Sequence, residues 1–176
     1  EKTRHNVGAM LATQIASENN AKFTSHKARA NIAEFKLGVG GEAPALVVVT
    51  LRTNMNDSGG PTKSLADFFK IPAERIIVAH DELDIPFSAI RMKRGGGDNG
   101  HNGLKSITQS LGTAEYFRIR LGIGRPPGSQ DPGDFVLKPF NSTERSELPD
   151  FLSRAVAATE VLIEKGLGLA QQEFNQ

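Results

Sequence analysis

The spacing of apolar residues along the chain predicts that helices and strands alternate. Near the start, four apolar side chains recur at the i, i+3, i+4, i+8 spacing of a helix packed on a core: Val7, Met10, Leu11 and Ile15. Alternating apolar positions or short β-branched runs predict strands over residues 28–37, 46–50, 76–79, 90–94 and 117–123. Helical spacing returns after Pro61, Leu104 and Asn141. This alternation predicts one α/β domain over residues 1–176, with a mixed sheet covered by helices on both sides.

Several connections carry patterns of their own. The loop 38–41 contains three glycines and joins two neighbouring strands, which predicts an antiparallel hairpin. The Pro/Gly-rich stretch 125–134 predicts a loop, and we expect it to act as a mobile cover. Gly166 suits the end of a long final helix.

Basic residues gather on two of the predicted strands. Residues 90–94 alternate apolar and basic side chains, so we expect three cations on one face, and strand 117–123 is expected to present a basic face too. Between Arg91 and Arg125, seven basic residues stand against two acidic ones, a local charge of 7 − 2 = +5: Arg91, Lys93, Arg94, Lys105, Arg118, Arg120 and Arg125. This charge favours a phosphate-bearing ligand, although a run of charges is more often a solvated face.

The run from Ile76 to Asp84 is the strongest candidate for chemistry. Its β-branched residues predict a buried strand over 76–79, followed by a polar cluster, His80-Asp81-Glu82, where the chain leaves the sheet. Ligands of open α/β sheets bind just beyond the carboxyl ends of such strands. A carboxylate held rigidly there can orient an imidazole and stabilise its charge, although Asp81 and Asp84 could equally cap a turn.

His5 is the candidate imidazole. It lies just before or within the first turn of the first predicted helix, where the helix dipole favours a neutral base near pH 7. A lone histidine at a helix start is more often incidental, so its position alone does not assign a role.

The overall composition is that of an ordinary globular protein. The chain has 176 residues, 38% hydrophobic and 23% charged, with a formal net charge of +1, and is long enough to bury a core without staples. It has no cysteine, which excludes disulfides and thiolate chemistry, and no apolar run of membrane-spanning length.

Three other kinds of site have weaker support. Gly95, Gly97 and Gly100 match the G-x-G-x-x-G fingerprint of dinucleotide-binding oxidoreductases, but no acidic ribose contact follows about 20 residues later. The same glycines could form a flexible turn, or let the backbone approach a substrate and present Asn102. Five residues could in principle be metal ligands: His5, His80, Asp81, Asp84 and His101. No pair of them has the i, i+4 spacing of a helical zinc site, so we predict no metal. No serine occupies a G-x-S-x-G elbow.

Several stretches taken together resemble one family, bacterial peptidyl-tRNA hydrolase. They occur in the family's order and cover nearly the whole chain: Thr3-Arg4-His5-Asn6-Val7-Gly8, Met55-Asn56-Asp57-Ser58-Gly59, His80-Asp81-Glu82-Leu83-Asp84, Gly95-Gly96-Gly97, Gly100-His101-Asn102-Gly103-Leu104-Lys105 and Arg118-Ile119-Arg120-Leu121-Gly122-Ile123-Gly124. The resemblance implies a single three-layer α/β/α domain, with a twisted mixed β-sheet flanked by helices, that is monomeric and cytoplasmic. It implies hydrolysis of the ester joining a peptide to the 3′ ribose of tRNA, without cofactor or metal, to recycle tRNA during translation. A catalytically inactive RNA-binding protein on the same fold is the alternative.

The resemblance also implies roles for particular residues. His5 matches the family's general base, Asp81 the carboxylate that orients it, and Asn56 and Asn102 the amides that hold peptide and water. The residues expected to bind substrate are the following: Met55, His101, Arg91, Lys93 and Arg120, with Lys105 added from its charge alone.

The chain departs from the family pattern in two places. The family begins with a strand and a Gly-x-x-Asn-Pro-Gly loop before the Thr-Arg-His-Asn motif, and this sequence has neither, so we expect it to be incomplete at its start. The residue before Met55 is usually aromatic in the family and is Asn54 here, which makes the packing of Asn56 less certain.

Overall fold

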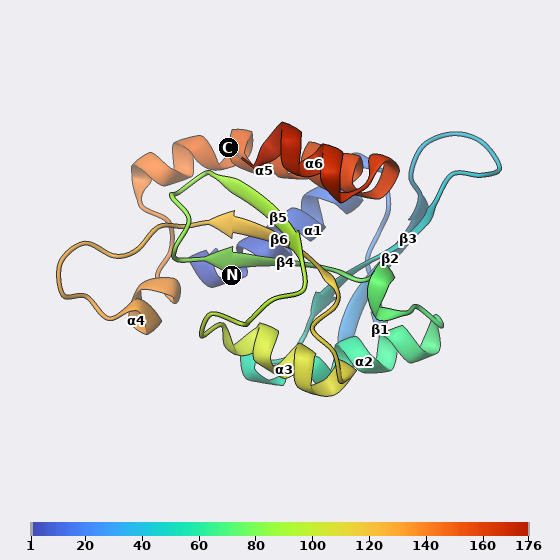
Figure 1. Cartoon of the computed structure of the whole chain (residues 1–176), viewed down its shortest axis with the longest axis horizontal. Coiled ribbons are helices and arrows are strands. Elements are labelled where there is room, and N and C mark those ends of the chain that lie inside the picture. The colour runs from blue at the N-terminus through green and yellow to red at the C-terminus, as the bar shows by residue number, and fades with distance from the viewer. Residues whose placement is uncertain (1, 176) are drawn as a thin grey trace. The chain divides into compact units, whose positions relative to one another are not determined.

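The computed structural model describes residues 2–175, which form two compact units. Unit 1 contains the described residues up to Gln14, Val78–Lys93, and the described residues from Arg118 onward, and unit 2 contains Ile15–Ile77 and Arg94–Phe117. The chain therefore passes between the units four times, and neither unit is a continuous segment. Each is described separately below, with the elements labelled as in Figure 1.

Unit 2 is built on an antiparallel sheet of three strands in the order β1-β2-β3. The strands are β1 (Thr24–His26), β2 (Ala30–Lys36) and β3 (Ala45–Leu51). In the β2–β3 pair Ile32 lies opposite Val49, so the predicted hairpin is confirmed. Ile32 and Ala30 are buried against Leu65 of helix α2 (Gly59–Phe68), which attaches that helix to the sheet.

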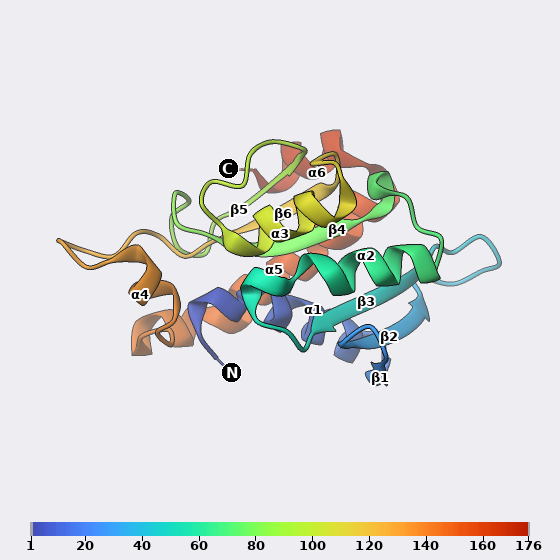
Figure 2. The same cartoon turned by 90° about the horizontal axis from the view of Figure 1, so that it is seen from below.

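A second helix of unit 2, α3 (Asn102–Leu111), packs beside α2, as Figure 2 shows. The contact is close because Gly59 has no side chain: a Cβ there would lie 2.1 Å from the Ser106 carbonyl oxygen. The backbone N–H of Gly59 also donates to Ser106 Oγ at 2.9 Å. Two short 3-10 helices, η2 (Met55–Asp57) and η3 (Ala73–Arg75), complete this unit, and η2 leads directly into α2.

The strands of unit 1 form a mixed sheet in the order β4-β6-β5. They are β4 (Ile77–Glu82), β5 (Ile90–Arg94) and β6 (Phe117–Gly122). Two hydrogen bonds join β6 to β4, from Phe117 N to Ile76 O and from Ile123 N to Glu82 O. The residue numbers of both partners rise together from one bond to the next, so β4 and β6 are parallel. The bonds from Gly95 N to Tyr116 O and from Gly122 N to Ala89 O run in opposite directions, so β5 is antiparallel to β6. The prediction of a mixed sheet is confirmed.

The helices of unit 1 come from both ends of the chain. A 3-10 turn, η1 (Arg4–Asn6), leads into α1 (Val7–Glu18), whose residues up to Gln14 belong to this unit. Later in the chain come α4 (Pro132–Val136), α5 (Ser142–Lys165) and α6 (Leu167–Phe174). Figure 1 shows β4, β6 and β5 side by side, with α5 and α6 running alongside them. After α6, the Asn175 side chain accepts a hydrogen bond from Met92 N at 2.7 Å and donates to Met92 O at 3.1 Å, which satisfies the free edge of β5.

The limits of α5 follow the signals in the sequence. Asn141 and Glu144 form a capping box at its start, and Gly166, with φ of +88°, ends it. The inner face of α5 is buried through Leu152, Ala155, Val156, Thr159 and Leu162. What the pattern missed is α6, which begins directly after Gly166.

The prediction that a strand ends at Ala79 was wrong. Strand β4 continues to Glu82, and His80, Asp81 and Glu82 are 4%, 4% and 9% exposed. Buried polar side chains persist in a strand only when they are hydrogen-bonded. His80 Nδ1 donates to the Asp81 carbonyl oxygen at 2.8 Å, and the Asp81 carboxylate meets His5, as described below.

The two predicted basic faces also need correction. Arg91 and Lys93 alternate with the buried Ile90 and Met92, but Arg94 falls on the opposite face by the strand's period of two and pairs with Glu115 at 3.7 Å. Arg118 is not on a solvated face at all, since it is only 1% exposed. Arg118 lies on the central strand of its sheet, β6, whereas Arg120, two residues further along the same strand, is only half-buried.

The predicted loop 125–134 ends earlier than expected. Asp131 caps a helix by accepting a hydrogen bond from Asp134 N, and Pro132 begins α4. At the other end of the loop, Arg125 pairs with Asp84 at 2.6 Å. Within residues 2–175, no helix combines the length and the apolar character that crossing a membrane requires.

Candidate active site

The imidazole of His5 lies against the carboxylate of Asp81. His5 Nδ1 is 2.9 Å from Oδ2 and 3.0 Å from Oδ1 of Asp81. A carboxylate only accepts hydrogen bonds, so the proton of the neutral imidazole is on Nδ1 and the lone pair is on Nε2. The side chains are 17% and 3% exposed, respectively, so the carboxylate is buried while part of the imidazole reaches the surface. This arrangement gives His5 a fixed tautomer with a basic nitrogen, which is what a general base requires.

A glycine brings these two groups together. Gly8 follows η1 in the first turn of α1, and a Cβ at this position would lie 2.1 Å from the carbonyl oxygen of Ala79 in β4. The helix start can therefore approach β4 only without a side chain here. Because Asp81 is two residues beyond Ala79 on the same strand, this close packing sets the distance from His5 to the carboxylate.

Two predicted amides lie on neighbouring elements of unit 2. Asn56 is in η2 and Asn102 is the first residue of α3; both are exposed, and η2 packs against α3. Gly103 permits this contact, since a Cβ there would lie 2.6 Å from Met55 Sδ. The turn of Met55 and Asn56 is also held by Ser58, whose hydroxyl donates to Met55 O at 2.7 Å. The two carboxamides are thus fixed through their backbones and open to a ligand.

His101 occupies the N-cap position of α3. Its Nδ1 accepts a hydrogen bond from Leu104 N at 3.2 Å. The proton of the neutral ring is therefore on Nε2, opposite to the assignment for His5. His101 is thus able to donate a hydrogen bond, whereas His5 is able to accept one.

The predicted phosphate-binding cations of unit 1 lie on two adjacent strands. Arg91 and Lys93 are on β5, and Arg120 is on β6. Burial lowers the pKa of Lys93, and the charges of Arg120 and Arg118 lower it further. Burial also lowers the pKa of Arg120, with Arg91 and Arg118 adding to the effect and Glu82 opposing it. These cations repel one another, so a bound polyanion would relieve that repulsion.

Comparison with known proteins decides the family. The family model described as peptidyl-tRNA hydrolase matches residues 1–176. The chain belongs to the peptidyl-tRNA hydrolase family. A relative from Kineococcus radiotolerans named peptidyl-tRNA hydrolase is 49% identical over 178 residues, covering 99% of this chain and 90% of its own. One of the same name from Frankia casuarinae is 51% identical over 172 residues, covering 98% and 85%. The crystal structure of peptidyl-tRNA hydrolase from Acinetobacter baumannii at 1.00 Å resolution matches with a TM-score of 0.88 and 29% identity, covering 97% of this chain and 85% of that one.

Membership of the peptidyl-tRNA hydrolase family confirms the resemblance and the α/β fold predicted from the sequence. Within each unit the structure adds contacts that the motifs alone did not give, His5 with Asp81 and η2 with α3. Lys105 is exposed on α3. The roles assigned to all these side chains stay predictions. So does the absence of a metal, although Asp84, one of the ligands considered on paper, is paired with Arg125.

Two features of this peptidyl-tRNA hydrolase family member were missed at the level of sequence. The first is the role of Gly8, for which the signal was the glycine that ends the Thr3–Gly8 motif and lies in the first turn of the helix. The second is the local support of Asn56 where the family's aromatic residue is replaced by Asn54. Asn54 is exposed and holds the turn through its backbone, accepting from Asp57 N at 2.9 Å.

Proposed function

We propose that this protein hydrolyses peptidyl-tRNA, cleaving the ester between the peptide and the 3′ ribose and so recycling tRNA during translation. The observation that carries the proposal is the pairing of His5 with the buried Asp81, in a chain matched from end to end by the peptidyl-tRNA hydrolase family model. The proposal extends to a cytoplasmic location and a monomeric state. It also treats residues 1–176 as a single domain, because a chain that passes between its two units four times is expected to unfold as one.

The reaction needs only a positioned water and a base. His5 Nε2 removes a proton from water as the water oxygen attacks the ester carbonyl carbon, and the resulting imidazolium is stabilised by Asp81. The tetrahedral intermediate then collapses, the bond to the ribose 3′ oxygen breaks, and the imidazolium returns the proton to that oxygen. The products are a peptide carboxylic acid, which loses its proton to solvent to give the carboxylate, and tRNA with a free 3′ hydroxyl. No metal or cofactor enters these steps.

Asn56 and Asn102 are proposed to hold the peptide and polarise the ester carbonyl. A carboxamide suits this task because it donates hydrogen bonds without adding charge, and a donor aimed at the developing oxyanion stabilises the transition state. Met55 and His101 are proposed to contact the substrate beside them. Because these groups recognise the peptide backbone, peptides of any sequence would be accepted.

The tRNA is proposed to bind through its phosphates. Arg91, Lys93 and Arg120 supply a row of cations on β5 and β6, and Lys105 adds one on α3. Such contacts position the nucleic acid without reading its sequence and weaken as salt rises.

The test is hydrolysis of a defined peptidyl-tRNA by the wild-type protein and by His5→Ala. We expect the variant to bind the substrate and to release almost no peptide. The matched control is His26→Ala, which removes a histidine from β1 in unit 2 and should keep wild-type activity. Equal release by wild type and His5→Ala would refute the role of His5 as the general base, and release by neither would refute hydrolysis and favour a binding protein on the same fold.

A further inference from the structure

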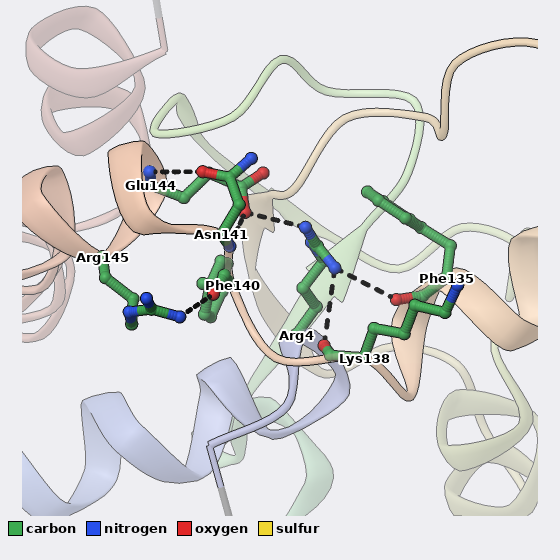
Figure 3. Close-up of polar contacts among 7 residues, drawn as sticks. All are labelled: Arg4, Phe135, Lys138, Phe140, Asn141, Glu144 and Arg145. Atoms are coloured by element: carbon green, nitrogen blue, oxygen red, sulfur yellow. Dashed lines mark hydrogen bonds and ion pairs between the residues drawn. The ribbon is translucent and has the colours of Figure 1, made fainter.

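Arg4, the residue before His5, is a buried charge. It is 5% exposed, and its Nη2 lies 2.8 Å from Oε2 of Glu144, as Figure 3 shows. Its Nη1 donates to the carbonyl oxygens of Phe135 and Lys138 at 3.4 and 3.5 Å, and its guanidinium carbon is 4.0 Å from the centroid of the Phe135 ring. Removing a charge from water is costly unless it is paired and hydrogen-bonded, so this degree of pairing is needed to keep Arg4 in place.

The partner of Arg4 is itself fixed. Glu144 Oε2 also accepts a hydrogen bond from Asn141 N at 2.7 Å, while Asn141 Oδ1 accepts from Glu144 N at 2.8 Å. This capping box ties the carboxylate to the first turn of α5. The Glu144 side chain is 14% exposed, so water competes little for the ion pair. Glu144 is therefore a rigid anchor for Arg4 rather than a mobile surface partner.

The backbone of η1 is held by the same segment of the chain. Arg4 N donates to Lys138 O at 3.1 Å, and Thr3 forms an isolated β-bridge with Pro139. On the other side of His5, Val7 is fully buried at the start of α1. The backbone of His5 is thus held on both sides. The hydrogen bond to Asp81 then fixes the rotation of its ring.

We propose that Arg4 is a positioning residue for His5: by pairing with Glu144 it holds η1 so that the imidazole meets Asp81. The inference rests on the proposed role of His5 as the general base. An arginine suits the task because its planar guanidinium reaches the carboxylate and two carbonyl oxygens at once. The compact ammonium of a lysine cannot span the same three acceptors.

The experiment compares Arg4→Lys and Glu144→Gln with the wild-type protein. It measures kcat and KM on peptidyl-tRNA, the ¹H NMR signal of the His5 Nδ1–H bonded to Asp81, and folding by circular dichroism. We expect kcat of Arg4→Lys to fall by about 10- to 100-fold, the effect of a small displacement of a catalytic group. KM should stay within about twofold, because the cations proposed to bind tRNA are unchanged. The Nδ1–H signal should shift or broaden, and Glu144→Gln should show the same changes to a smaller degree.

Arg145→Lys is the matched control. Arg145 donates to Phe140 O at 2.7 Å, within the same connection between α4 and α5, so this variant perturbs the segment without removing the pair with Arg4 (Figure 3). It should keep wild-type kcat and the wild-type His5 signal. A role in stability alone would lower the melting temperature of Arg4→Lys while kcat of the folded protein and the His5 signal stayed unchanged, and this result would overturn the inference.

The inference and the proposed function can fail separately. If Arg4→Lys does not fold, Glu144→Gln decides, because it keeps the shape of the side chain and removes only the charge. If His5→Ala proves active, the proposed role of His5 as the general base fails, and the Nδ1–H signal alone then decides whether Arg4 positions His5. A wild-type signal in a folded Glu144→Gln and a folded Arg4→Lys would refute the positioning role whatever the activity.

Discussion

One methyl group at Gly8 tests whether the packing of α1 on β4 sets the geometry of the site. In Gly8→Ala, the new Cβ would lie 2.1 Å from the Ala79 carbonyl oxygen, whereas ordinary contact begins at 3.4 Å. Relieving the clash requires a displacement of 3.4 − 2.1 = 1.3 Å, and the obstacle is backbone, which cannot rotate away as a side chain can. The start of α1 must therefore move away from the strand that carries Asp81.

A displacement of this size is enough to break the contact at the site. The Nδ1 to Oδ2 distance of 2.9 Å would grow to about 4 Å, beyond hydrogen-bonding range. We expect kcat to fall by about 100-fold, which corresponds to about 2.7 kcal/mol of transition-state stabilisation. Overpacking should also lower the free energy of unfolding by about 1–3 kcal/mol.

The assay is single-turnover hydrolysis of peptidyl-tRNA at a temperature where circular dichroism shows the variant to be folded. Gly168→Ala is the control, because a Cβ at that exposed position in α6 has no neighbour within 4 Å. Wild-type kcat in a folded Gly8→Ala, with the His5 Nδ1–H signal unchanged, would refute the reasoning.

Four further predictions follow from particular contacts. Asp81→Asn should lower kcat by about 10²- to 10⁴-fold with little change in KM, since the amide cannot stabilise the imidazolium; a loss below about threefold in steady-state kinetics would contradict this. Lys93→Ala should lower the slope of log affinity for tRNA against log salt by about 0.7 to 0.9, and an unchanged slope in a filter-binding titration would place the phosphates elsewhere. The pKa of Lys93 is lowered by burial and by Arg120, so the free protein loses this charge at a lower pH than an ordinary lysine would. The affinity for tRNA should therefore weaken as the pH rises through the alkaline range. The Lys93→Arg variant should show a weaker dependence of affinity on pH. Gly168→Ala should itself raise the free energy of unfolding by about 0.4–1 kcal/mol in a urea titration, because alanine is the better helix former at an exposed site.

The sequence was most informative where local chemistry decides structure. The helix start at Asn141 and the stop at Gly166 were predicted because hydrogen bonds within a few residues determine helix ends. The hairpin of β2 and β3 was predicted because a short glycine-rich loop, 38–41, joins the two strands. The start of α4 carried a similar signal in Asp131 and Pro132, which the surrounding Pro/Gly content obscured.

The errors arose where tertiary contacts decide. Strand β4 runs through three polar residues, and the partner of the buried Asp81 carboxylate, His5, is far away in the sequence. Arg118 is buried on the central strand β6, and neither strand order nor the packing on the faces of a sheet is encoded in the alternation of one strand. Gly8 and Arg4 are of the same kind, since the residues that they contact, Ala79 and Glu144, are identified only by the fold.

Chemical rescue of His5→Ala tests whether His5 activates the attacking water. His5→Ala is mixed with a defined peptidyl-tRNA in a single turnover, with and without added imidazole, beside the wild-type protein. We expect almost no release by the variant alone and a rate that rises with imidazole concentration, while the wild-type protein does not respond. Release by the variant at the wild-type rate without imidazole would contradict this expectation.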